Sequence, residues 1–139
     1  LTQAGYRVAV ATNQSGVGRG LLDMVQLNAI HTAMNKAVND AGGRIDAIFY
    51  CPHAADTQCT CRKPAPGMLR EISERFNTTL KNVPFVGDSM RDLQTAHAAG
   101  ALPVLVRTGK GLQTLKVGQL PDNTVIVDDL AAFVTQWVA

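Results

Sequence analysis

The sequence predicts an α/β fold, a doubly wound parallel sheet, and two patterns lead to this prediction. Short runs that are almost entirely apolar recur along the 139 residues, and stretches with helical spacing separate them. Strands that are apolar on both faces need helices on both sides of the sheet, which is the arrangement of parallel α/β folds. A chain of this length has the size of one common domain, so we expect residues 1–139 to form a single domain.

Each element has its own signal in the sequence. Strands are expected at five apolar or β-branched runs: "RVAVAT" (7–12), "IDAIFY" (45–50), "VPFVG" (83–87), "PVLVR" (103–107) and "TVIVD" (124–128). Apolar residues between Met24 and Ala41 recur at helical spacing, so we expect a long helix that ends at the glycine pair 42–43. Three more helices are expected, at 66–76, 91–99 and 130–138, and the last should bury Leu130, Phe133 and Trp137.

The composition excludes several classes of partner. Charged residues make up 17% of the chain and the net charge is +2, which favours neither nucleic acid nor a membrane surface. No apolar run approaches the ~18 residues of a membrane span, and the first residues do not resemble a signal peptide. We therefore expect a cytoplasmic monomer that binds neither nucleic acid nor membranes.

The segment 51–63 holds all three cysteines of the chain and has no large apolar side chain to form a core. Its pattern is Cys51-x-His53, then Cys59-x-Cys61, a Cys₃His set of the kind that binds zinc tetrahedrally. A Cys59–Cys61 disulfide is the alternative, but it would close a very tight ring in a chain without a secretion signal. We predict a structural Zn²⁺ whose binding orders this zinc loop.

Two clusters point to an anionic ligand. Arg62 and Lys63 follow the zinc ligands at once, and a guanidinium with an ammonium suits phosphate oxygens, although such a pair is also common on solvated surfaces. Thr12 ends a strand, and "NQSG" (13–16) then supplies amide, hydroxyl and backbone donors. Ligands of parallel α/β folds bind beyond the carboxyl ends of the strands, where these residues are expected.

A third cluster, "GDSMRD" (87–92), follows a later strand. Asp88 is expected at the strand end and Asp92 near the start of a helix. Carboxylate oxygens suit Mg²⁺, which often takes only one or two protein ligands, so Asp88 is the expected magnesium ligand. Asp92 is a candidate to support the magnesium site from behind, and the alternative, that it caps the helix, is compatible with that role.

These residues carry a resemblance to a known family. The strings Thr12-Asn13-Gln14, Lys63-Pro64 and Gly87-Asp88 with Asp92 resemble motifs two, three and four of the haloacid dehalogenase (HAD) superfamily of phosphatases. The Cys-Pro-His and Cys-x-Cys-Arg-Lys-Pro strings resemble its zinc-containing branch, which holds heptose-bisphosphate and histidinol-phosphate phosphatases. "TNQSGVGRG" (12–20), "KPAPGM" (63–68) and "RTGKG" (107–111) are more similar to the heptose enzymes.

The resemblance implies a reaction and a set of roles. An aspartate attacks phosphorus to give a phospho-aspartyl intermediate, Thr12 binds the phosphoryl group and Lys63 neutralises its charge, while Asp88 helps to hold Mg²⁺. The implied substrate is a phosphorylated sugar, a heptose 1,7-bisphosphate that loses its 7-phosphate on the route to lipopolysaccharide core sugars. The implied substrate contacts are Asn13, Gln14, Ser15, Arg62 and Ser89, and the heptose enzymes often have a lysine in place of Ser89.

Two other functions stay open at this point. A histidinol-phosphate phosphatase would use the same residues and mechanism. A zinc-stabilised binding module without catalysis is the alternative from another class, because residues 1–139 contain no Asp-x-Asp sequence for the nucleophile and the general acid–base. We expect that pair, and the family's first strand between the strands ending at Thr12 and Gly87, upstream of Leu1. Residues 1–139 alone are then expected to be inactive. The short distance between Thr12 and Lys63 leaves no room for a cap domain.

Overall fold

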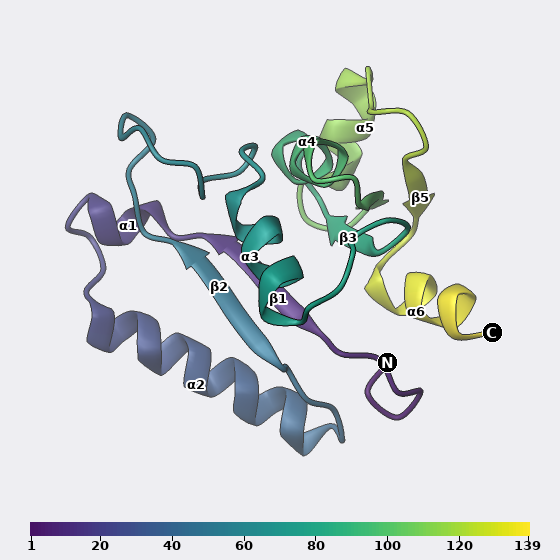
Figure 1. Ribbon diagram of the computed structural model, residues 1–139, viewed down its shortest axis with the longest axis horizontal. Coiled ribbons are helices and arrows are strands. Elements are labelled where there is room, and N and C mark those ends of the chain that lie inside the picture. The colour runs from purple at the N-terminus through teal and green to yellow at the C-terminus, as the bar shows by residue number, and fades with distance from the viewer. The chain divides into compact units, whose positions relative to one another are not determined.

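The computed structural model describes residues 1–139 and confirms the α/β class with parallel strands (Figure 1). The chain divides into two compact units, Leu1–Arg62 and Lys63–Ala139, and each has its own parallel sheet. The prediction of a single domain over residues 1–139 stays a prediction. No helix combines the length and the apolar character that crossing a membrane requires.

The first unit is built on two parallel strands, β1 (Ala9–Asn13) and β2 (Ala47–Cys51). Their register pairs Ala9 with Ala47 and Asn13 with Cys51, so both strands end at the same level. The single turn α1 (Ser15–Gly18) follows β1 after one residue, Gln14. The first cysteine of the zinc loop and the polar residues after β1 therefore lie at one edge of this sheet.

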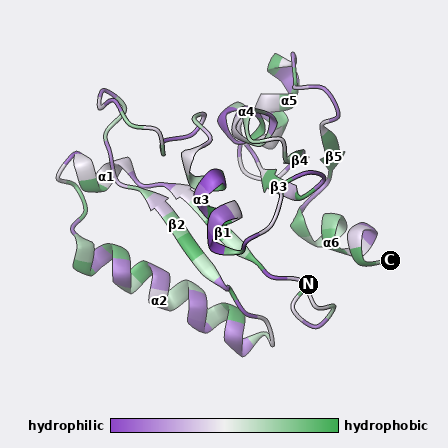
Figure 2. Cartoon of the chain, viewed as in Figure 1, coloured by the Kyte–Doolittle hydropathy of each residue, from purple (hydrophilic) through white to green (hydrophobic).

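Helix α2 (Met24–Asp40) lies alongside β2 (Figure 1) and confirms the long helix expected before the glycine pair. It begins with a capping box in which the Asp23 carboxylate accepts from the Gln26 amide. The His31 ring packs 5.7 Å from the Tyr50 ring of β2, between ring centroids. Hydrophilic and hydrophobic residues are interspersed along α2 (Figure 2), and Leu27 is its fully buried residue. Of the apolar stripe expected on α2, only Leu27 is therefore buried.

The second unit has three parallel strands in the order β3 (Pro84–Gly87), β4 (Leu102–Val106) and β5 (Val125–Val127). Helix α3 (Gly67–Arg75) precedes β3, while α4 (Met90–Ala98) and α5 (Gly111–Val117) connect the strands and α6 (Leu130–Val138) follows β5. α4 packs against β3 and β4, and α6 packs against β5. The buried core between β4, β5 and α6 contains Val104, Val106, Val127 and Phe133.

Three details depart from the sequence-based expectations. Helix α5 was not predicted, and neither was the short turn α1. Phe133 is buried and Trp137 packs against the core as expected, but Leu130 is 56% exposed, so its predicted burial is wrong. Leu130 is the first residue of α6 and has no preceding helical turn to cover it. Between β1 and Lys63 the chain forms only α1, α2, β2 and the zinc loop, so no cap domain is inserted there.

Candidate active site

The polar turn after β1 is fixed by hydrogen bonds within the first unit. The Gln14 side-chain amide donates to Thr12 Oγ1 over 3.1 Å, and the Gln14 backbone amide donates to the Cys51 carbonyl over 2.8 Å. Thr12 and Asn13 end β1, Gln14 follows, and Ser15 begins α1, all half-buried. The structure thus brings the predicted phosphate-binding turn beside the first residue of the zinc loop.

Gly18 allows the segment after β1 to approach the zinc loop closely. The Gly18 amide donates to the Pro52 carbonyl over 2.7 Å. A Cβ atom at position 18 would lie 2.6 Å from that carbonyl oxygen and 2.7 Å from the Ala54 nitrogen. Because such distances are far below van der Waals contact, only glycine fits here. The turn after β1 and the zinc loop are packed backbone against backbone.

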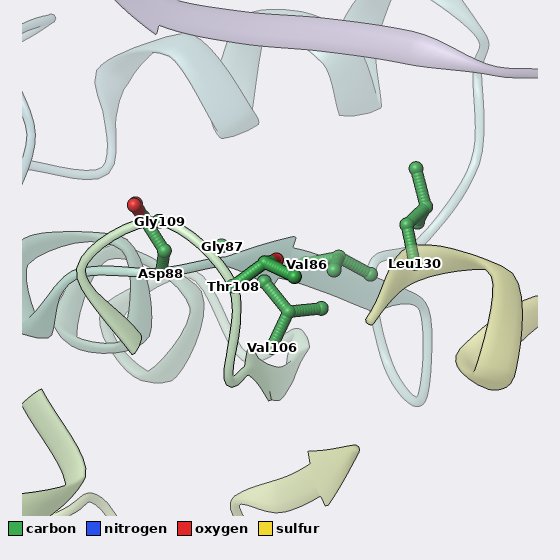
Figure 3. Close-up of a pocket in the computed structure, with 7 residues that line it drawn as sticks. All are labelled: Val86, Gly87, Asp88, Val106, Thr108, Gly109 and Leu130. Carbon is green, nitrogen blue, oxygen red and sulfur yellow. The ribbon is translucent and has the colours of Figure 1, made fainter. Parts of the chain in front are cut away.

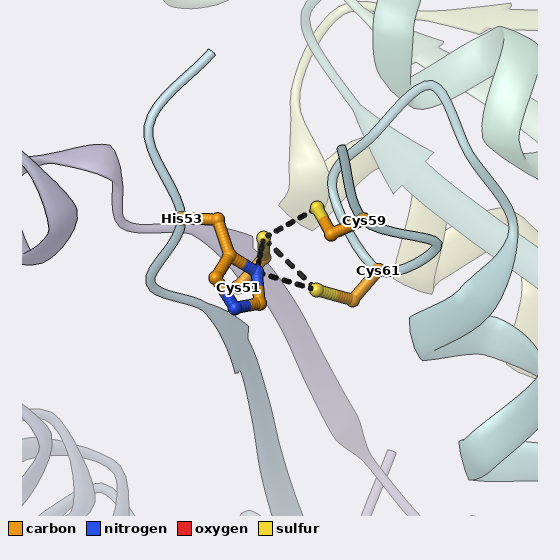
Figure 4. Close-up of side chains that lie close together, drawn as sticks. All are labelled: Cys51, His53, Cys59 and Cys61. Carbon is orange, nitrogen blue, oxygen red and sulfur yellow. Dashed lines mark hydrogen bonds between the residues drawn. The ribbon is translucent and has the colours of Figure 1, made fainter. Parts of the chain in front are cut away.

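The four predicted zinc ligands converge (Figure 4). Their ligand atoms, the three Sγ atoms and the His53 Nδ1 atom, all lie within 4.8 Å of one another. Cys51 Sγ lies 3.4 Å from His53 Nδ1, 3.7 Å from Cys59 Sγ and 3.0 Å from Cys61 Sγ. A tetrahedral zinc–thiolate site has sulfur–sulfur edges of about 3.8 Å, so this donor set fits Zn²⁺.

The thiols of the cluster differ in their acidity. The backbone hydrogen bond from Arg62 lowers the pKa of Cys59 to about 7. Burial raises the pKa of Cys61 to about 12, and the neighbouring thiols add to this. All three cysteines are free thiols, which excludes the disulfide alternative in this structure. A divalent cation would stabilise the thiolate form of all three, as metal ligation requires.

Arg62 directly follows the cluster and carries an unsatisfied donor. Its Nη1 atom is buried and has no hydrogen-bond partner. A buried guanidinium nitrogen without a partner is costly, because it has lost its hydration and gained nothing in return. Arg62, which is expected to contact the substrate, therefore has a guanidinium nitrogen that is available to donate a hydrogen bond.

In the second unit, Lys63 forms an ion pair that the sequence did not predict. Its Nζ atom lies 2.7 Å from Asp92 Oδ1, and the two side chains are 13% and 10% exposed. The ammonium also lies 5.8 Å from the centroid of the Phe85 ring. A lysine held in this way loses little conformational entropy when it binds an anion.

Asp92 uses its second oxygen to organise the turn after β3. Asp92 Oδ2 accepts from the Asp88 and Ser89 amides, each over 3.2 Å, and from Ser89 Oγ over 3.0 Å. Ser89 is the N-cap residue of α4 and Asp92 its third residue, so the two form a capping box. Both interpretations of Asp92 fit this geometry, because it caps α4 and supports Asp88 from behind. The Ser89 hydroxyl is engaged in the cap, and its contact with the substrate stays a prediction.

The charge state of Asp92 follows from its partners. Burial raises the pKa of this carboxyl, but the hydrogen bond and charge of Lys63, with the hydrogen bonds of Ser89, outweigh burial and hold the pKa below its usual value. Asp92 therefore stays ionised when Asp88 binds a cation.

Asp92→Asn is expected to lower the free energy of unfolding by about 3 kcal/mol at neutral pH, because it leaves the Lys63 ammonium buried without a counter-charge. A lowered carboxyl pKa contributes stability that is complete above the unfolded-state pKa, about 3.9, and is lost as the pH falls through the folded-state pKa. The difference between wild type and variant should therefore shrink below about pH 4. Urea unfolding at several pH values measures it.

The matched control is Asp40→Asn. Asp40 pairs with Lys36 at 2.6 Å, but both side chains are well exposed, at 65% and 75%. Such exposed pairs contribute little, so this change should leave the unfolding free energy nearly unaltered. A loss at Asp92 that stayed constant at acid pH would show that the ion pair is not its cause.

The chain is similar to several known proteins. Residues 60–133 match the HAD-hydrolase-like family. The D-glycero-β-D-manno-heptose-1,7-bisphosphate 7-phosphatase of Bordetella bronchiseptica is 54% identical over 136 residues, which cover 98% of this chain and 76% of that protein. The enzyme of the same name from Pseudomonas aeruginosa is 52% identical, over 95% of this chain and 74% of its own.

The chain belongs to the HAD-like hydrolases.

Solved structures of such hydrolases have the same fold. The crystal structure of D,D-heptose 1,7-bisphosphate phosphatase from B. bronchiseptica, complexed with magnesium and phosphate, has a TM-score of 0.98 at 54% identity. It covers 99% of this chain, which corresponds to 77% of that one. The Burkholderia thailandensis enzyme has a TM-score of 0.81 at 48% identity, over 100% of this chain and 79% of its own. The resemblance to HAD phosphatases is therefore confirmed.

One part of this HAD-like hydrolase was missed at the sequence level. Asp88 Oδ2 accepts from the Lys110 backbone amide over 2.8 Å, and Thr114 Oγ1 donates to the Asp88 carbonyl over 2.7 Å. The string "RTGKG" was the only available signal, and it indicated a resemblance but no contact. Asp88 also lines a cavity of about 300 Å³ at the ends of β3 and β4, together with Val86, Gly87, Val106, Thr108, Gly109 and Leu130 (Figure 3).

Proposed function

We propose that this HAD-like hydrolase removes the 7-phosphate of D-glycero-β-D-manno-heptose 1,7-bisphosphate, a reaction on the route to lipopolysaccharide core sugars. The observation that carries this proposal is the 54% identity, over 98% of the chain, to an enzyme of that name. The enzyme from Neisseria meningitidis, with the same name, is 49% identical over 96% of the chain. The substrate is a phosphorylated sugar, and the chain acts as a monomer in the cytoplasm.

Mg²⁺ and Zn²⁺ are the proposed metal ions. The Bordetella structure contains magnesium with phosphate, and Asp88 supplies the hard oxygen donor that Mg²⁺ prefers. When bound, Mg²⁺ stabilises negative charge on the phosphoryl oxygens. The soft Cys₃His set favours Zn²⁺, and with four protein ligands this second site is closed and structural.

The roles of the side chains follow from their chemistry. Lys63 neutralises the charge that develops on the transferred phosphoryl group, and the ion pair with Asp92 holds its ammonium in place. Thr12 donates its hydroxyl to a phosphoryl oxygen, and Asn13, Gln14 and Ser15 supply further donors from the turn after β1. Arg62 offers its unsatisfied nitrogen to the substrate, and Ser89 contributes a weaker contact because it also caps α4.

A comparison of two substrates tests the proposal. Protein translated from the complete reading frame is assayed for phosphate release from the heptose bisphosphate and from histidinol phosphate. We expect kcat/KM to favour the heptose by about 100-fold or more, because a site that pairs buried donors with one substrate rejects another that leaves them unpaired. The product should retain its 1-phosphate.

The other outcomes identify the alternatives. Equal or reversed kcat/KM values would contradict the heptose assignment and favour the histidinol enzyme. No turnover of either substrate, with magnesium present and the protein folded, would favour the zinc-stabilised binding module.

A further inference from the structure

The loop after β4 reaches back to the end of the neighbouring strand. β3 and β4 pair in parallel with Gly87 opposite Leu105, so the segments that follow them leave the sheet at the same edge. The segment after β3 begins with Asp88, and the segment after β4 is the turn 107–110, which leads into α5. The pairing of β3 with β4 therefore brings Asp88 close to the turn 107–110, although about twenty residues separate them in the sequence.

The turn and helix α5 contact two polar groups of Asp88, its carboxylate and its carbonyl. The Lys110 amide donates to Asp88 Oδ2 over 2.8 Å. The Thr114 hydroxyl donates to the Asp88 carbonyl over 2.7 Å and lies 3.2 Å from the Lys110 carbonyl. With Oδ2 engaged by a backbone amide, the carboxylate has one orientation, and Oδ1 remains for a cation. Thr114 is buried, so water has little access to its side chain.

Gly109 allows this close approach. Its φ is +58°, in the left-handed region, and a Cβ atom there would overlap Asp88 Oδ2 (Figure 3). Any other residue at position 109 must therefore turn the carboxylate or move the turn. The conformation of the turn and the direction of the Asp88 carboxylate therefore depend on each other.

We propose that the turn 107–110 and Thr114 position the Asp88 carboxylate for its cation. The inference rests on the proposed function, in which Asp88 is a magnesium ligand. Groups that hold a metal ligand in place typically change metal affinity by 10- to 100-fold when they are removed. Lys110 acts here through its backbone, so Thr114 and Gly109 are the positions at which side-chain changes test the role.

The experiment measures Mn²⁺ affinity, by the loss of the free-ion electron paramagnetic resonance signal, in protein from the complete reading frame. Thr114→Val keeps the shape and removes the hydroxyl, and we expect its Mn²⁺ affinity to fall about 10-fold. Thr114→Ser restores the donor and should stay within about twofold of wild type. Gly109→Ala should weaken Mn²⁺ binding by more than about 10-fold, because the methyl group displaces the carboxylate.

Gly118→Ala is the matched control. Gly118 has a φ of +76°, so alanine there is also strained in its backbone, but no atom lies within 4 Å of the added Cβ position. Its thermal stability should fall as it does in Gly109→Ala, while its Mn²⁺ affinity should not change. This separates the loss of carboxylate direction from general backbone strain.

Asp88→Asn separates the inference from the function on which it rests. If Asp88→Asn binds Mn²⁺ as well as wild type, the metal role of Asp88 is wrong and the inference falls with it. If Asp88→Asn loses Mn²⁺ while Thr114→Val and Gly109→Ala both retain it, the positioning role alone is overturned. Losses in Thr114→Val and Gly109→Ala, with Thr114→Ser and Gly118→Ala normal, support it.

Discussion

Lys63→Met is expected to lower kcat/KM for the heptose bisphosphate by about 10³-fold, or about 4 kcal/mol of transition-state stabilisation. Lys63 is the one cation that the second unit holds beside a buried carboxylate, with 2.7 Å between Nζ and Asp92 Oδ1. Its loss removes a positioned charge that a mobile surface lysine cannot replace. Steady-state phosphate release measures the effect, with the exposed Lys116→Met as the control that should keep full activity.

A double variant separates catalysis from folding in this experiment. Lys63→Met leaves Asp92 buried and unpaired, so the single variant should also be less stable. Adding Asp92→Asn removes the unpaired charge and should recover part of the unfolding free energy, but no activity. If activity returned together with stability, the role of Lys63 would be structural and the catalytic assignment would be wrong.

Cys59→Ser is expected to reduce zinc content from about one ion per chain to nearly none, because a hydroxyl is a poor fourth ligand for a Cys₃His site. The zinc loop has no core of its own, so its backbone order should be lost together with the metal. Elemental analysis of the purified protein measures the zinc. Amide hydrogen exchange measures the order of residues 51–63.

Thr60→Ala is the control for this second experiment. Thr60 lies between Cys59 and Cys61, is exposed, and contributes no ligand atom to the cluster. Zinc content and amide protection in Thr60→Ala should match the wild type. Retention of zinc in Cys59→Ser, or an ordered loop without metal, would refute a structural zinc site.

Most of the fold could be predicted because its signals are local. Five apolar runs and four helical stretches correspond to the strands and to helices α2, α3, α4 and α6. Helix α5 (Gly111–Val117) spans less than two full turns after a glycine-containing turn, so its sequence shows too little periodicity for prediction. Leu130 fits the apolar face of α6, but it is exposed. Its exposure depends on which residues pack around the first turn of the helix, and the periodicity of the sequence does not predict these neighbours.

The candidate site was predictable where its residues are close in sequence. The four ligands of the Cys/His cluster fall within eleven positions, from Cys51 to Cys61, and their chemistry is specific. The Lys63–Asp92 pair joins residues 29 positions apart, and the Lys110–Asp88 contact joins residues 22 positions apart. Neither has a local pattern, and the Lys110–Asp88 contact depends on the pairing of β3 with β4, which brings the ends of these two strands together. Tertiary contacts of this kind require the structure.

The close packing at Gly18 has a consequence for protein engineering. Directed-evolution libraries that aim at new sugar phosphates would diversify the turn after β1 and the zinc loop, since both follow strand ends. At Gly18 the two segments touch through their main chains, and even one methyl group would be 2.6 Å from the Pro52 oxygen. Such libraries should keep position 18 invariant and recombine the two segments from one parent, as a single cassette.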